Sequence, residues 1–306
     1  MNYYINVQGG TGLNFGLASF ISYLKNNGTK DKFYVSSSYW DIFESCPAVD
    51  GVYKPNELKD MIFDAKDDPD SKIITSRIYD LDGFIKKQLN YSEAWAQLLG
   101  ISWDKEEGGT KVKSELEPLK AFPYLKDKVE EVKKEINGRK YIIVQFTGGQ
   151  SPLTQVPDGD WSKVNYDYNN EPLKRHYPTD KAQKFIDLYQ EKHPDTVILT
   201  YQLPNEPKVT GKNVISKTMP YLAYYELAKD AEYIVAIDSS LQHMCAGVCK
   251  EYVIWAHSKP EHFGYNYNTN ILQECRTNDL LYFTALGPSG AKVKYIEPEE
   301  LLNRIE

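Results

Sequence analysis

The sequence has no long apolar run and few cysteines. No segment approaches the roughly 20 apolar residues that a membrane span needs, and no basic segment followed by an apolar one opens the chain. The four cysteines, at positions 46, 245, 249 and 275, follow neither the spacing of a zinc site nor that of a disulfide framework. These absences favour a cytoplasmic protein.

Positive charge is also in short supply. Lys and Arg number 36 against 43 Asp and Glu, so the net charge is −7, which argues against non-specific affinity for nucleic acid. A local basic patch is still compatible with this balance. The hydrophobic content of 41% in a chain of 306 residues is enough for a sizeable core and for one large domain or two ordinary ones.

Short apolar segments alternate with amphipathic helices along the chain. Such segments include 3–8, 32–36 and 72–76 in the first half and 140–146, 196–202 and 232–237 in the second. This alternation predicts an α/β fold. A charged helix ends at Asn137-Gly138, and there we place a domain boundary. The sequence therefore predicts two Rossmann-like domains, 1–137 and 138–306.

Residues 232–257 contain the most informative pattern. A run rich in β-branched residues predicts a buried parallel strand, and it ends at residues that cap helices. A helix over 241–249 and a second buried strand over 252–256 would complete a βαβ unit. Such units bind ligands where their strands end, because helix N-terminal N–H groups there face anions. A simple cap and a buried structural histidine are the alternative. The residues at this rim are Asp238, Ser239, Ser240, Gln242 and His243.

A glycine-rich turn follows a predicted strand in each half. Gly9-Gly10-Thr11-Gly12 precedes a helix, where a backbone that approaches a ligand closely needs glycine. No acidic residue lies on the next strand and no Lys-Ser/Thr pair follows, so a nicotinamide or ATP site is disfavoured. Thr147-Gly148-Gly149 repeats the pattern in the second half. For both, a tight turn that needs positive φ is the structural alternative.

Weaker signals come from the loops of the second half. Arg175 could offer a planar guanidinium to a phosphate, and Glu206, after a strand end that contains Gln202, could accept hydrogen bonds from ribose hydroxyls. An exposed arginine and an exposed carboxylate are the alternatives. Asp158-Gly159-Asp160 lies in the middle of the long loop 151–177, so we expect no metal there. Two similar halves with glycine-rich strand ends suggest a two-domain transferase, with acceptor and activated donor on separate halves.

The second half resembles the heptosyltransferase-type glycosyltransferases, which have the GT-B fold of two Rossmann-like domains facing a central cleft. The Thr147-Gly148-Gly149 turn, Arg175-His176-Tyr177-Pro178 and Glu206 follow the family's order. The family's most specific motif is a strand followed by Asp, Ser/Thr, a small residue, His and Ala. Residues 238–246, DSSLQHMCA, fit it. The first half is similar in outline, with a helix that ends in Leu99-Gly100.

The resemblance implies transfer of a sugar from a nucleotide-sugar donor to a hydroxyl of a glycan or a lipid-linked saccharide. It implies no cofactor and no obligatory metal, because helix dipoles and fixed N–H groups would stabilise the departing diphosphate. Asp238 and His243 would be catalytic. The donor side would comprise Thr147, Gly148, Gly149, Arg175, Gln202, Glu206, Ser239, Ser240 and Gln242, and the acceptor side Gly10, Thr11, Gly12 and Asn14.

The chain departs from the family on its first loop. The family has Gly-Asp there, and the Asp serves as general base, whereas this chain has Gly12-Leu13-Asn14. An asparagine cannot take a proton. Either another carboxylate is the base, with Asp80 or Asp82 at an expected strand end as candidates and Asp82 as our choice, or the acceptor, the stereochemistry or the activity differs.

Two alternatives to glycan transfer stay open. The first is a phage-type DNA glycosyltransferase that modifies hydroxylated bases, and it requires a basic patch on the first domain. The second is a non-catalytic sugar-nucleotide-binding protein, which the missing Gly-Asp motivates. The patch would be formed by Lys25, Lys30, Lys32, Lys86 and Lys87.

Overall fold

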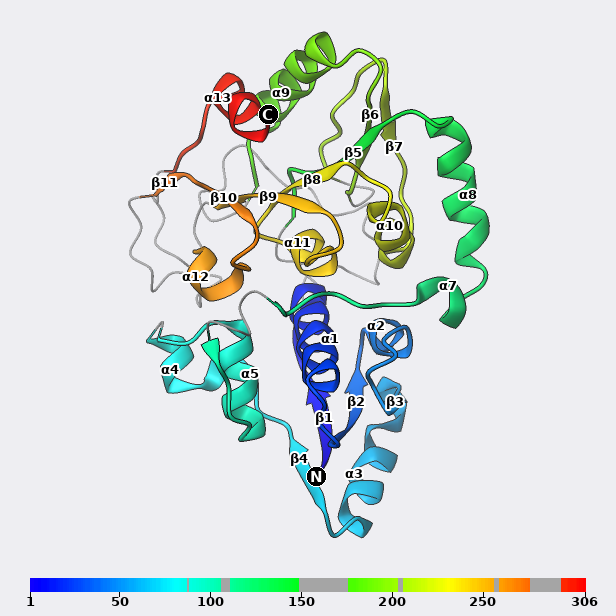
Figure 1. Ribbon diagram of the computed structural model, residues 1–306, viewed down its shortest axis with the longest axis vertical. Coiled ribbons are helices and arrows are strands. Elements are labelled where there is room, and N and C mark those ends of the chain that lie inside the picture. The colour runs from blue at the N-terminus through cyan, green and yellow to red at the C-terminus, as the bar shows by residue number, and fades with distance from the viewer. Residues whose placement is uncertain (87, 106–110, 149–175, 203–205, 256–258, 276–292) are drawn as a thin grey trace, which may run out of the picture. The chain divides into compact units, whose positions relative to one another are not determined.

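The computed structural model describes residues 1–86, 88–105, 111–148, 176–202, 206–255, 259–275 and 293–306 (Figure 1). The chain forms two compact units. Unit 1 contains Met1–Asp127, His243–Val248 and Glu261–Tyr267, and unit 2 contains Lys128–Gln242, Cys249–Pro260 and Asn268–Glu306. The division into two α/β units agrees with the predicted fold class. The chain first changes unit after Asp127, and the boundary at Asn137 stays a prediction.

Unit 1 is built on a parallel sheet in the order β3-β2-β1-β4. Its strands pair in register, so that Tyr3 lies opposite Phe33 and Tyr4 opposite Tyr34, and both pairs of rings stack, with centroids 5.4 and 4.7 Å apart. These cross-strand contacts help to fix the register. The elements are β1 (Asn2–Val7), α1 (Thr11–Asn26), β2 (Lys32–Ser37), α2 (Trp40–Glu44), β3 (Gly51–Tyr53), η1 (Pro55–Glu57), α3 (Leu58–Asp67), β4 (Ser71–Ile74), η2 (Ile78–Asp80), α4 (Asp82–Ile85), α5 (Tyr91–Leu99) and α7 (Pro118–Ala121).

Helix α5 begins and ends as its sequence requires. The Asn90 side chain accepts a hydrogen bond from the Glu93 amide, and the Glu93 carboxylate accepts one from the Asn90 amide. This reciprocal capping satisfies N–H groups that the first turn leaves without partners. Gly100 then ends the helix in the left-handed region, at φ 72°. The helix presents Tyr91 to α1.

The approach of α5 to α1 depends on Gly16. A Cβ at this position would lie 2.6 Å from Tyr91 Cε1, which is closer than atoms of a close-packed core tolerate. We expect Gly16→Ala to lower the free energy of unfolding by about 1–2 kcal/mol, because overpacking outweighs the gain in helix propensity. Gly10→Ala is the control, since a Cβ there meets no atom within 4 Å. Urea denaturation measures both, and an unchanged Gly16→Ala midpoint would contradict the packing argument.

Unit 2 contains a parallel six-stranded sheet in the order β10-β9-β8-β5-β6-β7 (Figure 1). The chain runs outward from β5 to β7, returns to β8 beside β5, and runs outward again to β10. The strand order therefore reverses between β5 and β8, and ligands of doubly wound sheets bind at such a point. The strands are β5 (Tyr141–Gln145), β6 (Val197–Thr200), β7 (Val214–Ser216), β8 (Tyr233–Ile237), β9 (Lys250–Trp255) and β10 (Thr269–Leu272).

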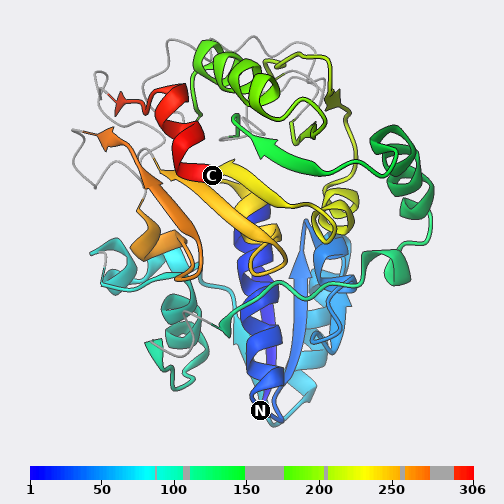
Figure 2. The same ribbon diagram turned by 45° about the horizontal axis from the view of Figure 1, so that its top comes forward.

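Helices α9 (Thr179–Lys192) and α13 (Pro298–Ile305) lie side by side over one face of this sheet (Figures 1 and 2). Alternate residues of the strands face them, such as Ile142 and Val144 of β5, and join one apolar core with Phe185 and Leu301. The remaining elements are α8 (Leu125–Ile136), α10 (Tyr221–Ala228), α11 (Ser240–Met244), α12 (Pro260–Phe263), β11 (Glu274–Cys275) and β12 (Val293–Lys294). In the part of the chain described, no helix combines the length and the apolar character that a bilayer crossing requires.

The helix predicted over 241–249 is too long. Helix α11 ends at Met244, and β9 begins at Lys250, two residues before the predicted strand. The reason lies in the turn between them, where Gly247 adopts a left-handed conformation at φ 68° and the Val248 amide donates to the Cys245 carbonyl at 2.7 Å. A helix this short has little macrodipole, so the predicted dipole stabilisation of an anion is correspondingly small.

Candidate functional site

The carboxyl ends of β5 and β8 bring two predicted segments of unit 2 together. The Gln145 side chain donates from Nε2 to Ser239 Oγ at 3.1 Å and accepts from the Leu241 amide at 3.3 Å. Gly148 packs so closely that a Cβ on it would lie 2.6 Å from Ser239 Oγ. Thr147–Gly148 and Ser239–Leu241 thus line the point where the strand order reverses.

Asp238 follows β8 and is almost completely buried, with 1% of its surface exposed. Its Oδ1 accepts a hydrogen bond from Gln242 Nε2 at 2.7 Å. Gln242 itself has no exposed surface, and its side-chain amide holds the aspartate in place, while its role in donor binding stays a prediction. A buried carboxylate needs such partners, because an unpaired charge away from water is very costly.

Thr147 and Glu206 form a second buried pair beside this point. The Thr147 hydroxyl donates to Glu206 Oε2 at 2.9 Å, and both residues are buried. The alternative of an exposed loop carboxylate at position 206 is therefore wrong. The Tyr201 hydroxyl lies 3.3 Å from Ser240 Oγ and connects the end of β6 to the start of α11.

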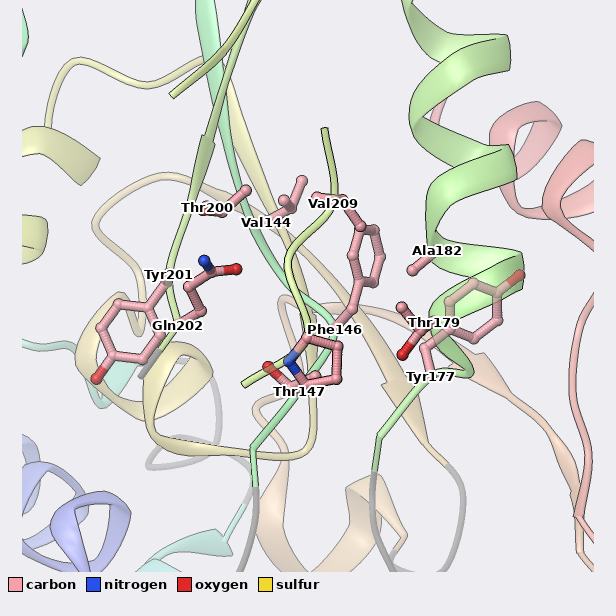
Figure 3. A pocket seen from close by; sticks show the side chains of 11 residues that line it. Val144, Phe146, Thr147, Tyr177, Thr179, Ala182, Thr200, Tyr201, Gln202 and Val209 are labelled. Carbon is pink, nitrogen blue, oxygen red and sulfur yellow. The ribbon is translucent and has the colours of Figure 1, made fainter. Parts of the chain in front are cut away.

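A small pocket lies between the carboxyl ends of β5 and β6 and the first turn of α9 (Figure 3). Its cavity volume is about 10 Å³, which is room for at most about one water molecule. Two predicted donor residues, Thr147 and Gln202, line it together with aromatic rings. The other lining residues are Val144, Phe146, Tyr177, Thr179, Ala182, Thr200, Tyr201, Pro207 and Val209.

His243 packs within unit 1, although Asp238 to Gln242 belong to unit 2. The buried imidazole stacks on the Tyr91 ring, with centroids 5.2 Å apart and planes at 9°. Its Nδ1 lies 3.1 Å from the Tyr265 hydroxyl, and the Tyr91 hydroxyl lies 3.0 Å from that of Tyr79. The imidazole is therefore held in one orientation. Neither of the two interpretations of His243, a buried structural histidine or a catalytic residue, had specified this orientation.

The acceptor-side prediction concerns the loop after β1 in unit 1. Asn14 has no exposed surface. Its Nδ2 donates to the Gly10 carbonyl at 2.9 Å, and its Oδ1 accepts from Ser37 Oγ at 2.5 Å. The amide thus ties the glycine-rich turn to the end of β2. Gly10 has φ −74°, so its backbone does not need a glycine. Thr11 and Gly12 open α1.

The two candidate bases do not lie at a strand end, contrary to the sequence-based expectation. Strand β4 ends at Ile74, and Asp80 and Asp82 belong to η2 and α4. Arg77 donates two side-chain hydrogen bonds to Asp80 and thereby lowers the pKa of its carboxyl below the ordinary value. Asp82 is exposed and forms an ion pair with Lys86.

Three predicted features lie outside the described residues, namely Gly149, Arg175 and Asp158-Gly159-Asp160. Within the described residues, no group of three or more His, Cys, Asp or Glu side chains is arranged to hold a metal ion.

The sequence had predicted no site role for Gln145, Tyr91 or Tyr265. A polar residue at the end of the apolar strand YIIVQ was the one available signal, and it pointed to Gln145.

The chain folds into two parallel α/β units, as predicted, and it shares the GT-B-type fold of several solved structures, among them glycosyltransferases. One is the family 9 glycosyl transferase from Veillonella parvula DSM 2008, with a TM-score of 0.60, 10% identity, and coverage of 89% of this chain and 85% of that one. Another is E. coli ADP-heptose LPS heptosyltransferase II, with a TM-score of 0.58, 10% identity, and coverage of 100% and 97%.

A third similar structure is the iron-containing dodecameric glycosyltransferase TibC of enterotoxigenic E. coli H10407, with a TM-score of 0.50, 10% identity, and coverage of 88% and 61%. No family model and no curated protein matches the sequence. At these identities the likeness establishes the fold. The resemblance to heptosyltransferase-type enzymes that the motifs indicated is thus confirmed at the level of architecture.

Proposed function

We propose that this chain is a glycosyltransferase that moves a sugar from a nucleotide-sugar donor to a hydroxyl acceptor, a glycan or a lipid-linked saccharide. One observation carries the proposal: Thr147–Gly148 and Ser239–Leu241 meet at the reversal point of the unit 2 sheet. Doubly wound sheets bind the phosphates of nucleotides at this position. The fold shared with glycosyltransferases, one of them named for ADP-heptose, supports the same assignment.

Hydroxyl and amide groups, more than a helix dipole, would recognise the diphosphate here. The Ser239 hydroxyl accepts from Gln145 Nε2, which leaves its own hydrogen to donate to a phosphate oxygen. Gly148 lacks the side chain that would separate a ligand from the backbone. Fixed donors of this kind stabilise charge that develops on the departing nucleotide. Asp238 and His243 are the residues we expect to be catalytic.

A thermal-shift panel of nucleoside diphosphates and their sugars tests the proposal. A ligand at 100 times its Kd adds about 2.7 kcal/mol to the free energy of unfolding, so at least one diphosphate should raise the Tm clearly. The same panel with EDTA tests the predicted metal independence, a useful comparison because TibC contains iron. If no nucleoside diphosphate shifts the Tm, the proposal is wrong.

Sugar-nucleotide binding without transfer is the second candidate function, and Asn14 favours it. The amide of Asn14 is engaged by Gly10 and Ser37, so the position where the family has its base holds a structural residue. Incubation with the nucleotide sugar that binds most tightly decides between the two. Hydrolysis or transfer by the wild type that is lost in Asp238→Ala and His243→Ala would establish catalysis.

The DNA alternative gains no support from unit 1. Lys25 forms an ion pair with Asp50, and Lys86 with Asp82, so two of the five lysines in the required patch have acidic partners. Lys87 lies outside the described residues. A cytoplasmic location stays a prediction from the sequence.

A further inference from the structure

Gln145 connects the two segments that form the candidate diphosphate site. It ends β5, the strand beside the reversal point, and only 3% of its surface is exposed. Its carboxamide contacts both the Ser239 side chain and the Leu241 backbone.

The Leu241 amide fixes which way the Gln145 carboxamide points. A backbone N–H can only donate, so the atom that faces it must be the carbonyl oxygen, Oε1. The NH₂ group, Nε2, therefore faces Ser239 Oγ at 3.1 Å. Because Nε2 is a donor, the serine oxygen must accept, and the serine hydrogen turns away from Gln145. An amide thus sets the direction in which a hydroxyl donates.

We infer that Gln145 is a positioning residue for the donor diphosphate, which aligns the 239–241 segment and orients the Ser239 hydroxyl hydrogen toward a phosphate oxygen. This inference rests on the proposed function, since it assigns a role within the same site. A neutral side chain is required as well as a well-shaped one. A carboxylate would accept from both Ser239 and Leu241, redirect the serine hydrogen, and add negative charge beside an anionic ligand.

Gln145→Glu separates this role from simple packing. The glutamate keeps the length and can keep both hydrogen bonds, so the fold should remain, while the Kd for a nucleoside diphosphate should rise about tenfold or more through redirection and repulsion. Gln145 is buried, and salt screens buried charges only weakly, so the loss should largely persist between 50 mM and 500 mM NaCl. A purely structural defect would instead lower the Tm of the ligand-free protein.

Gln183 provides a matched control. It also bridges a backbone amide, accepting from Thr210 N at 2.9 Å while Nε2 donates to the Thr210 carbonyl at 2.8 Å, and it lies on the exposed side of α9 in the same unit. Gln183→Glu adds the same charge to a similar bridge away from the two segments. We expect its Kd to stay within about twofold of the wild-type value, a small fraction of the 1.4 kcal/mol that a tenfold change represents.

Isothermal titration calorimetry of ADP, UDP and GDP with the wild type and each variant measures the Kd values that test the inference. Wild-type binding together with a folded Gln145→Glu variant that binds tenfold more weakly supports the inference. Wild-type binding with an unaffected Gln145→Glu variant overturns it and leaves the proposed function intact. No binding to the wild type overturns both. Should Gln145→Glu fail to fold, Gln145→Asn decides, because the shorter amide cannot span both partners, and binding as tight as wild type would refute the role.

Discussion

Replacing Gly148 with alanine is expected to weaken nucleoside diphosphate binding about 10- to 100-fold. The added Cβ would lie 2.6 Å from Ser239 Oγ and 3.0 Å from Gln145 Nε2. Relief of that overlap costs about 1–3 kcal/mol and pushes the 147–148 segment away from the 239–241 segment. Binding weakens by the part of this strain that the displacement adds in the complex, and 1.4 kcal/mol of that difference corresponds to a factor of ten in Kd.

Gly211→Ala is the control for this effect. A Cβ at Gly211 would approach Gln190 Oε1 to 2.4 Å, a similar overlap in the same unit, but with the end of a side chain that takes no part in the candidate site. Both variants should show comparable changes in Tm. Calorimetric titration should find weakened binding only in Gly148→Ala, and equal binding by the two variants would contradict the placement of the diphosphate.

Replacing Phe185 with alanine should produce the largest loss of stability. Phe185 has no exposed surface and packs against Phe146 and Tyr189, with ring centroids 5.6 and 5.9 Å away. Truncation of a buried phenylalanine typically costs 3–5 kcal/mol, roughly, because a cavity remains. The loss should also affect the pocket, since Phe146 lines it.

The matched control is Phe63→Ala on α3, because 50% of the surface of Phe63 is exposed. Lys59 Nζ lies 5.5 Å from the centroid of the Phe63 ring, and exposed contacts of this kind contribute about 0.5–1 kcal/mol. Guanidinium denaturation followed by circular dichroism would measure both. A Phe185→Ala midpoint no lower than that of Phe63→Ala would show that the α9 core is not as tightly packed as described.

Local chemistry made most of the elements predictable from the sequence. The strand compositions, the Asn90 and Glu93 cap and the glycine-rich turns each determine structure within a few residues. The meeting of residues 147–148 with 239–241 was also predictable, because parallel strands place their carboxyl ends at one edge.

The remaining features depend on contacts between residues far apart in the chain. Asn14 reads as a polar helix residue, and only Ser37 on the next strand reveals that its amide is buried and engaged. The expected placement of Asp80 and Asp82 at a strand end was wrong because β4 stops at Ile74 and short helical turns follow it. His243 is oriented by Tyr91 and Tyr265, and a chain rich in tyrosine gives no signal of which rings will pair.

The passage of the chain back into unit 1 at His243–Val248 and Glu261–Tyr267 limits how such a protein can be recombined. Phe263 packs its ring against Phe84 and Tyr91, 5.5 and 5.4 Å away, so the first lobe is completed by sequence that lies well over a hundred residues downstream. A chimera cut at a single mid-chain point would leave that aromatic cluster with foreign neighbours. Transplanting unit 1 therefore requires a three-piece graft that carries both returning segments with the N-terminal part.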